Sequence, residues 1–181
     1  MGWLSLAVLF LVVSCRAQNA SFPGRTAKLR SPDGRYVIEN VDYDERDPAH
    51  GLFLVDTKTR AKIKIQGYAR GVDVLWSPES EAFVVNDHEG SDSTRPLLYS
   101  LPWTGSKTDL LEELTVFMRA RHQEGQMHRD DHSYLTVRRW MNSRDLLCKL
   151  EAYGNRRTFE GSYLYTIGEG FHVYDPKDQN K

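Results

Sequence analysis

One polar segment of the sequence gathers side chains of the types that bind ligands or metals. Residues 86–93 place carboxylates at Asp87, Glu89 and Asp92 and an imidazole at His88. Such oxygen donors suit Ca²⁺, which takes roughly six to eight oxygen ligands, but their spacing does not match the EF-hand loop. A solvated hairpin is the favoured interpretation, a ligand-facing loop comes second and a metal site third. Asp87, His88, Glu89 and Asp92 are therefore the candidate ligand-binding residues, and no metal is expected.

A histidine-rich segment follows further along the chain. His122, His128 and His132 occur in a stretch that also holds two aspartates. His128 and His132 are four residues apart, a spacing that suits a metal only if the segment is helical. Because the stretch contains Gly125 and is polar throughout, a connector is favoured over a metal site.

Motifs for catalysis are missing from the sequence. It has no Gly-x-Ser-x-Gly elbow, no Walker loop and no Cys-x-x-Cys pair. The 25 acidic residues are scattered over loops, and a glycosidase pair is recognised only by its geometry. Cys148 lies in a strand-like apolar run, where a buried and inert thiol is favoured over a nucleophile. The sequence therefore favours a protein with no catalytic residue and no cofactor.

The charge distribution argues against nucleic acid as a partner. The chain of 181 residues carries 24 basic and 25 acidic side chains, which are interspersed, and its formal net charge is −1. A protein that binds nucleic acid would show a basic stripe. A hydrophobic content of 40% indicates a globular domain rather than a disordered chain.

The N-terminus is typical of a secretory signal peptide, which we assign to residues 1–17. Residues 3–13 form an apolar run that is too short to span a bilayer, since a spanning helix takes about 20 residues. Cleavage after Ala17 would leave Gln18 first, whereas lipidation of Cys15 would tether the domain to a membrane surface. The soluble outcome is slightly favoured. We expect a secreted or periplasmic protein that meets a membrane only through such an anchor.

A turn cluster followed by an apolar run occurs three times. Residues 31–38 read Ser-Pro-Asp-Gly-Arg-Tyr-Val-Ile, residues 76–84 carry a second copy, and residues 140–147 carry a looser third copy. The apolar runs around these copies predict short antiparallel strands. One helix is predicted over residues 107–122, opened by a capping box at Ser106, with an apolar stripe that packs on a sheet.

These patterns set the fold class and the boundaries. The fold is expected to be mostly β, with three blade-like antiparallel units that are propeller-like and open or incomplete, plus one inserted helix. The parts are a signal peptide (1–17), a linker (18–30), a single β-repeat domain (31–176) and a polar tail (177–181).

The first two units resemble the WD40-like propeller repeat of the TolB type. The residues that carry the resemblance are Ser31-Pro32-Asp33-Gly34 with residues 52–56, and Trp76-Ser77-Pro78 with residues 97–101. The resemblance is good over residues 28–103 and poor over residues 132–175. A closed propeller needs about four to eight blades, and this chain has material for three.

The resemblance implies a function as well as a fold. Repeats of the TolB type build periplasmic modules for binding and scaffolding rather than enzymes. We therefore expect a non-catalytic module whose partner is a protein or a cell-envelope component, bound through loops at one end of the sheets. Two alternatives stay open: an extracellular hydrolase that uses loop carboxylates, and a structural module that completes a propeller by oligomerisation.

Overall fold

The computed structural model describes residues 17–43, 48–123, 132–153 and 158–175. The predicted polar tail, His128, the lipidation candidate Cys15 and all of the predicted signal peptide except Ala17 lie outside the described residues. Within the described residues, no helix has the length and apolar character needed to cross a membrane.

Strands make up most of the described chain, so the prediction of a mostly β fold is confirmed. The elements are β1 (Asn19–Phe22), β2 (Lys28–Arg30), β3 (Tyr36–Asp42), β4 (His50–Asp56), β5 (Lys62–Tyr68), β6 (Val72–Trp76), β7 (Ala82–Asp87), β8 (Ser93–Ser100), β9 (Thr108–Asp109), α1 (Leu110–Ala120), β10 (His132–Trp140), β11 (Asp145–Tyr153), β12 (Thr158–Thr166) and β13 (Gly170–Val173).

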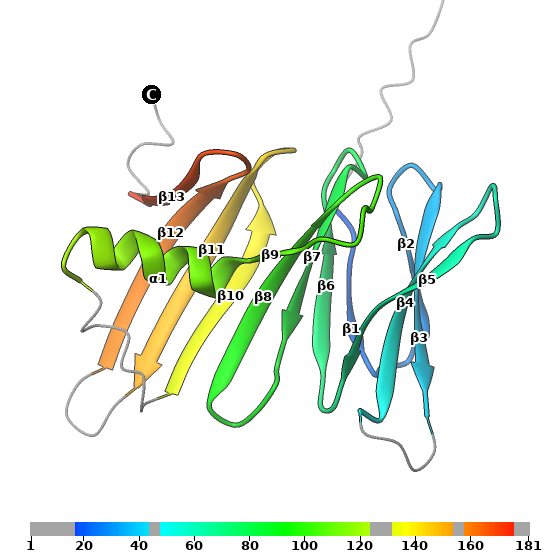
Figure 1. Ribbon diagram of the computed structural model, residues 1–181, viewed down its shortest axis with the longest axis horizontal. Coiled ribbons are helices and arrows are strands. Elements are labelled where there is room, and N and C mark those ends of the chain that lie inside the picture. Colours follow the sequence, from blue (N-terminus) through cyan, green and yellow to red (C-terminus); the bar gives the residue numbers. More distant parts are fainter. Residues whose placement is uncertain (1–16, 44–47, 124–131, 154–157, 176–181) are drawn as a thin grey trace, which may run out of the picture.

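The strands form three successive antiparallel meanders of four strands each, called here the first, second and third meander. The first meander, β2 to β5, is a sheet by itself. The second, β6 to β9, is widened by β1, which pairs with β6. The third, β10 to β13, joins the second through a parallel pairing of β10 with β8 over only two residue pairs. Neither sheet closes on itself, and Figure 1 shows the meanders side by side.

The second meander is buried on both of its faces. On β7, Phe83 and Val85 belong to the core shared with the first meander, whereas Ala82 and Val84 belong to the core shared with the third meander and α1. Successive side chains of a strand point to opposite faces of its sheet. A strand covered on both faces must therefore bury every residue, and all six residues of β7 are buried.

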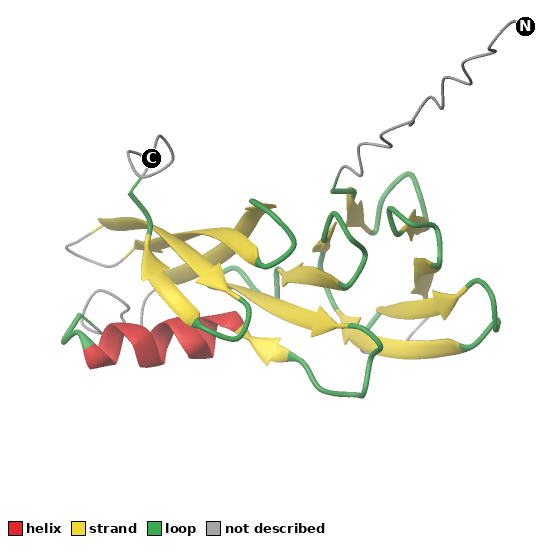
Figure 2. Ribbon diagram, turned by 90° about the horizontal axis from the view of Figure 1, so that it is seen from above, coloured by secondary structure: helices red, strands yellow, loops and turns green. Residues whose placement is uncertain are grey.

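The helix α1 covers the core between the second and third meanders. Leu110, Leu114 and Met118 recur at helical spacing, and all three are fully buried in the same cluster as Tyr163 and Phe171. The helix lies across the third meander in both views (Figures 1 and 2). The predicted packing of its apolar stripe on a sheet is confirmed.

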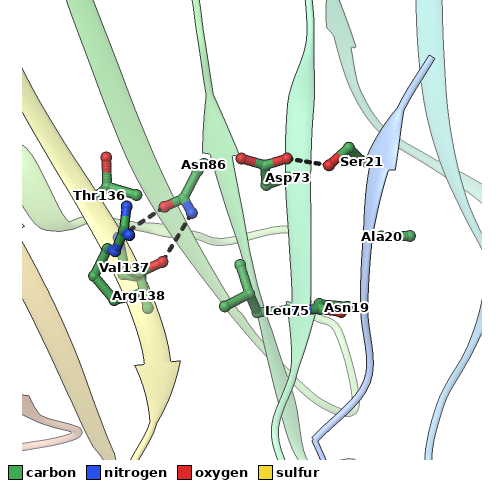
Figure 3. A pocket seen from close by; sticks show the side chains of 9 residues that line it. All are labelled: Asn19, Ala20, Ser21, Asp73, Leu75, Asn86, Thr136, Val137 and Arg138. Carbon is green, nitrogen blue, oxygen red and sulfur yellow. Dashed lines mark hydrogen bonds between the residues drawn. The ribbon is translucent and has the colours of Figure 1, made fainter. Parts of the chain in front are cut away.

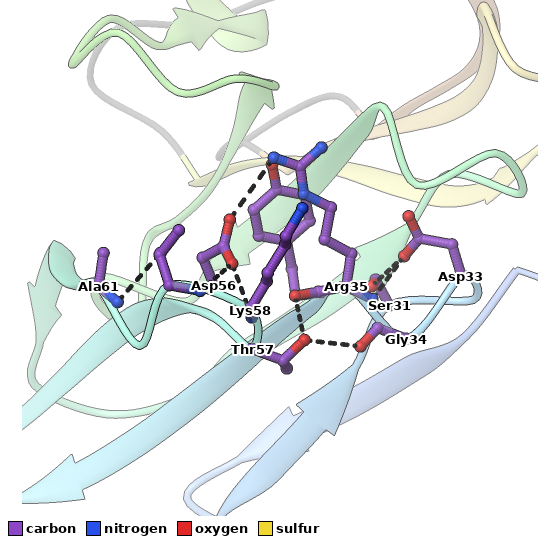
Figure 4. Close-up of polar contacts among 10 residues, drawn as sticks. Ser31, Asp33, Gly34, Arg35, Asp56, Thr57, Lys58 and Ala61 are labelled. Atoms are coloured by element: carbon purple, nitrogen blue, oxygen red, sulfur yellow. Dashed lines mark hydrogen bonds and ion pairs between the residues drawn. The ribbon is translucent and has the colours of Figure 1, made fainter.

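The three copies of the repeated turn occupy the same place, between the first and second strands of each meander. In the first copy the Ser31 N–H donates to the Tyr36 carbonyl, and the Ser31 hydroxyl accepts the Tyr36 N–H. Ser77 and Ala82 make the same two bonds in the second copy. Figure 4 shows the polar contacts around the first copy.

The fourth residue of the turn must adopt a left-handed backbone conformation. Gly34 has φ of 75° in the first copy, and Ser80 has φ of 64° at the equivalent position of the second. Glycine takes this conformation freely, whereas serine is strained in it. The buried Ser80 hydroxyl accepts the N–H of Asp33, at 3.0 Å, and so ties the second turn to the first.

Two boundary predictions were wrong. Residues 18–30 are not a linker, because they contain β1 and β2. Each of these strands buries one apolar side chain in the core, Phe22 on β1 and Leu29 on β2. The helix is shorter than residues 107–122, since Thr108 and Asp109 pair with β8 before it begins. Asp109 replaces Ser106 as the N-cap, and its carboxylate accepts two N–H groups of the first turn.

The buried turn serine offers a test of this architecture. We expect Ser77→Ala to lower the free energy of unfolding by about 1–3 kcal/mol, because the buried N–H of Ala82 loses its acceptor. Urea denaturation followed by circular dichroism measures the change. Ser143→Ala, in the turn of the third copy, removes a hydroxyl that makes no hydrogen bond in the described structure and serves as the matched control. Equal stability of the two variants would contradict the role assigned to Ser77.

Candidate functional site

The four predicted ligand-binding residues do not converge on one point. Asp87 is buried at the end of β7 and accepts a hydrogen bond from Gln66. His88 contacts the second meander, Glu89 lies 3.8 Å from Arg95, and Asp92 lies 3.2 Å from His132. Within the described residues, no group of three histidine, cysteine or acidic side chains is placed to hold a metal ion.

Asp87 sits at the junction of the first and second meanders. The Gln66 amide on β5 donates to Asp87 at 2.8 Å, and its oxygen accepts the Tyr99 hydroxyl at 2.5 Å. Burial, together with the nearby charge of Glu89, raises the pKa of Asp87 to about 6, while the bond from Gln66 opposes the rise. This carboxyl therefore contributes to the contact between meanders rather than to an open site.

An open groove lies where the second and third meanders meet, and most of its residues were not singled out from the sequence. It has a volume of about 260 Å³. Its residues come from four strands: Asn19, Ala20 and Ser21 of β1, Asp73 and Leu75 of β6, Asn86 of β7, and Thr136, Val137 and Arg138 of β10 (Figure 3).

The groove exists because β10 separates from β8. The two strands pair only at Ser133 and Tyr134 of β10, so further along β10 pairs with β11 on one side and has no partner strand on the other. The side chain of Asn86 takes over at Val137: its amide donates to the Val137 carbonyl and its oxygen accepts the Val137 N–H, each at 3.0 Å. One buried amide thus fixes β10 against β7 and defines one wall.

Asp73 stands on the opposite wall in a chain of hydrogen bonds. The Ser21 hydroxyl donates to one of its oxygens at 2.5 Å, and His88 Nε2 lies 3.0 Å from the other. His88 Nδ1 lies 3.1 Å from the Thr94 hydroxyl. When Nε2 carries the hydrogen, His88 donates to Asp73 and accepts from Thr94. Of the four predicted residues, His88 is the one that supports the groove, since its Nε2 contacts the carboxylate of Asp73.

Arg138 stands on the β10 wall at a β-bulge. Val137 pairs with Cys148 and Arg139 pairs with Leu147, so Arg138 is the extra residue between them. A bulge interrupts the ladder and redirects the extra side chain. Arg138 is exposed, and its guanidinium makes no hydrogen bond or ion pair within the described residues.

The hydroxyl and thiol groups near the groove are not arranged as nucleophiles. Ser21 donates to a carboxylate rather than to an imidazole, so it lacks the adjacent base that activates a serine. Thr94 does face His88, but it is only 3% exposed. Cys148 is buried, as predicted, and burial raises the pKa of its thiol well above the usual range.

The sequence did contain one signal for the groove. Asp73 interrupts the apolar run of residues 72–76, and a carboxylate in a buried strand requires polar partners. Arg138 and Asn86 gave no comparable signal, because the bulge and the divergence of β10 depend on packing between distant strands.

Comparisons with known proteins add no relative. The chain matches no protein-family model, and no curated protein or solved structure is detectably similar to it. The resemblance of its turns to the TolB-type repeat stays a prediction, and its function is inferred from the groove and the fold.

The raised pKa of Asp87 predicts how stability depends on pH. An unfolded aspartate has a pKa of about 3.9, so the ionised form disfavours the folded state. The stability that Asp87 contributes is full below about pH 4 and is lost as the pH rises through about 6. Asp87→Asn should therefore raise the free energy of unfolding at pH 8 by about 2 kcal/mol and change it little at pH 4.

Urea denaturation at pH 4, 6 and 8 measures this difference. Asp92→Asn serves as the control, because Asp92 lies on the surface with 73% of its side chain exposed. A stability gain from Asp87→Asn that is the same at all three pH values would show that Asp87 does not titrate as described.

Proposed function

We propose that this protein is a non-catalytic binding module of the secreted or periplasmic space, and that the groove is its ligand site. The proposal rests on one observation: Arg138, which has no partner within the described residues, stands on one wall of an open cavity and Asp73 on the other. Ligand sites are concave and fix their ligand with a few placed polar groups. The partner is a protein, a peptide or a cell-envelope component that presents polar groups to this groove.

The rigidity of the walls supports this proposal. Asn86 holds β10 through two bonds, and Asp73 is held by Ser21 and His88. Polar groups fixed before a ligand arrives lose little conformational entropy on binding. A groove built this way favours recognition of a defined partner over loose adsorption.

We also propose that the three meanders are blade-like repeats of an incomplete propeller. The support is the common position of the turn, which follows the first strand of each meander and precedes the second. The turn serves the fold rather than the ligand, since the groove is lined by strands β1, β6, β7 and β10.

A hydrolase that uses loop carboxylates has less support. A pKa near 6 suits a general acid, which favours Asp87 for this role. However, Asp87 is only 6% exposed and is occupied by Gln66, and neither Asp87 nor Glu89 lines the groove.

The edges of the sheets bear on the oligomeric alternative. At the outer edge strand β5, Lys62 and Lys64 are exposed, and lysines on an edge strand disfavour pairing with a second chain. The strands at the other three ends of the sheets are short: β1 and β13 have four residues each, and β2 has three. We therefore expect a monomer for the mature protein, measured by native mass spectrometry at micromolar concentration. A stable dimer would instead support the module that completes a propeller by oligomerisation.

The binding function is tested by capture of the partner from the protein's own host. Mature wild-type protein is immobilised beside Arg138→Ala and Arg139→Ala, and the bound molecules are identified by mass spectrometry. We expect Arg138→Ala to reduce capture about tenfold, because a charge-assisted hydrogen bond is worth roughly 1.5–3 kcal/mol. Arg139→Ala is the matched control, since Arg139 is an exposed neighbour that does not line the groove.

Two results would contradict the groove as the ligand site. One is capture that is equal for wild type and both variants. The other is loss that is equal for the two variants, which would indicate a general effect of surface charge.

A further inference from the structure

We infer that the ligand of the groove is a small zwitterion, an amino acid or a dipeptide, whose carboxylate pairs with Arg138 and whose ammonium group pairs with Asp73. This inference rests on the proposed function and names the ligand class of the same site. It follows from the two charges of opposite sign that the facing walls carry.

The β10 wall supplies the group for a carboxylate. The guanidinium of Arg138 is planar and presents N–H donors in a fork that matches the two oxygens of a carboxylate. No acidic side chain satisfies it within the described residues, and it is exposed at the groove. A carboxylate in the groove would give Arg138 the partner that the protein itself does not provide there.

The β6 wall supplies the group for an ammonium. A carboxylate offers roughly four acceptor positions, and Asp73 uses two of them, for Ser21 and His88. Its side chain is 40% exposed, so its other positions face solvent. These positions are open to an ammonium group in the groove.

The dimensions of the groove limit the ligand to a short molecule. A cavity of about 150 Å³ accommodates benzene, so a groove of 260 Å³ holds roughly ten non-hydrogen atoms. A volume of this size suits an amino acid or a dipeptide of two small residues.

The groove also mixes polar and apolar groups. Asn19 and Thr136 offer donors and acceptors for a peptide group, while Leu75 offers apolar contact for a small side chain (Figure 3). Asp73 would repel a ligand that carried only a negative charge. Arg138 would repel a ligand that carried only a positive charge. A molecule that carries both charges satisfies both walls.

The test uses three probes that differ by one charge at a time. Alanylalanine carries both charges, N-acetyl-alanylalanine lacks the ammonium, and alanylalaninamide lacks the carboxylate. Each probe is titrated into the mature protein, and binding is followed by two-dimensional NMR of the backbone amides. We expect saturable binding of alanylalanine with shifts at Ser21, Asp73 and Thr136, and binding about tenfold weaker for each blocked probe.

The variants assign each charge to its wall. Arg138→Ala should bind alanylalanine about as weakly as wild type binds the amide probe, and should discriminate no longer between those two probes. Asp73→Asn should behave in the same way toward the acetylated probe. Arg139→Ala should bind all three probes as wild type does. Arg138 is exposed, so its replacement by alanine should leave the fold intact. The Arg138→Ala titration therefore tests the carboxylate contact even if Asp73→Asn is unstable.

The outcomes separate this inference from the proposed function. Equal binding of the three probes, or no saturable binding of alanylalanine, overturns the zwitterion. If partner capture still depends on Arg138 in that case, the groove remains the ligand site for another chemistry. If neither capture nor probe binding depends on Arg138, both proposals fall.

Discussion

Burial of both faces of the second meander is the constraint on which the rest of the structure depends. Its strands contribute alternate side chains to two cores, one shared with the first meander and one shared with the third meander and α1. Neither neighbour can therefore move away without exposing apolar surface of the central unit. The repeated turns follow the same logic, since Ser31 and Ser77 are buried where adjacent units approach and must satisfy backbone groups there.

The same constraint creates the groove. A strand that is buried on both faces leaves no water for a polar side chain, so Asn86 must find protein partners. The N–H and carbonyl of Val137, which face away from β11, need partners too, because β10 has left β8. Each group satisfies the other, and the bond between them holds the third meander close to β7 while a space stays open in front of β6. The site is thus a consequence of how two units meet.

The sequence was informative where structure is local. Alternating apolar residues and turn clusters predicted the strands and the repeated turns, and the spacing of Leu110, Leu114 and Met118 predicted α1 and its buried stripe. The sequence was not informative where a strand forms only by pairing with a distant segment of the chain. β1 and β2 are short and polar enough to look like a linker, and they become strands only because β6 and β3 offer them edges. The divergence of β10 has no local signal, so the place of the groove could not be predicted even though Asp73 stands out in its apolar run.

The residues that break local rules point to function more strongly than the conspicuous polar loop did. Asp73 places a charge in an otherwise apolar strand, and Arg138 interrupts a regular ladder with a bulge and leaves its own charge unpaired within the described chain. Neither feature improves packing: the half-exposed side chain of Asp73 adds nothing to either core, and an unbroken β10 would gain a ladder position. Sequences keep such departures mainly where a site requires them. That the two departures face each other across one groove is difficult to explain by stability and simple to explain by a ligand that carries both charges.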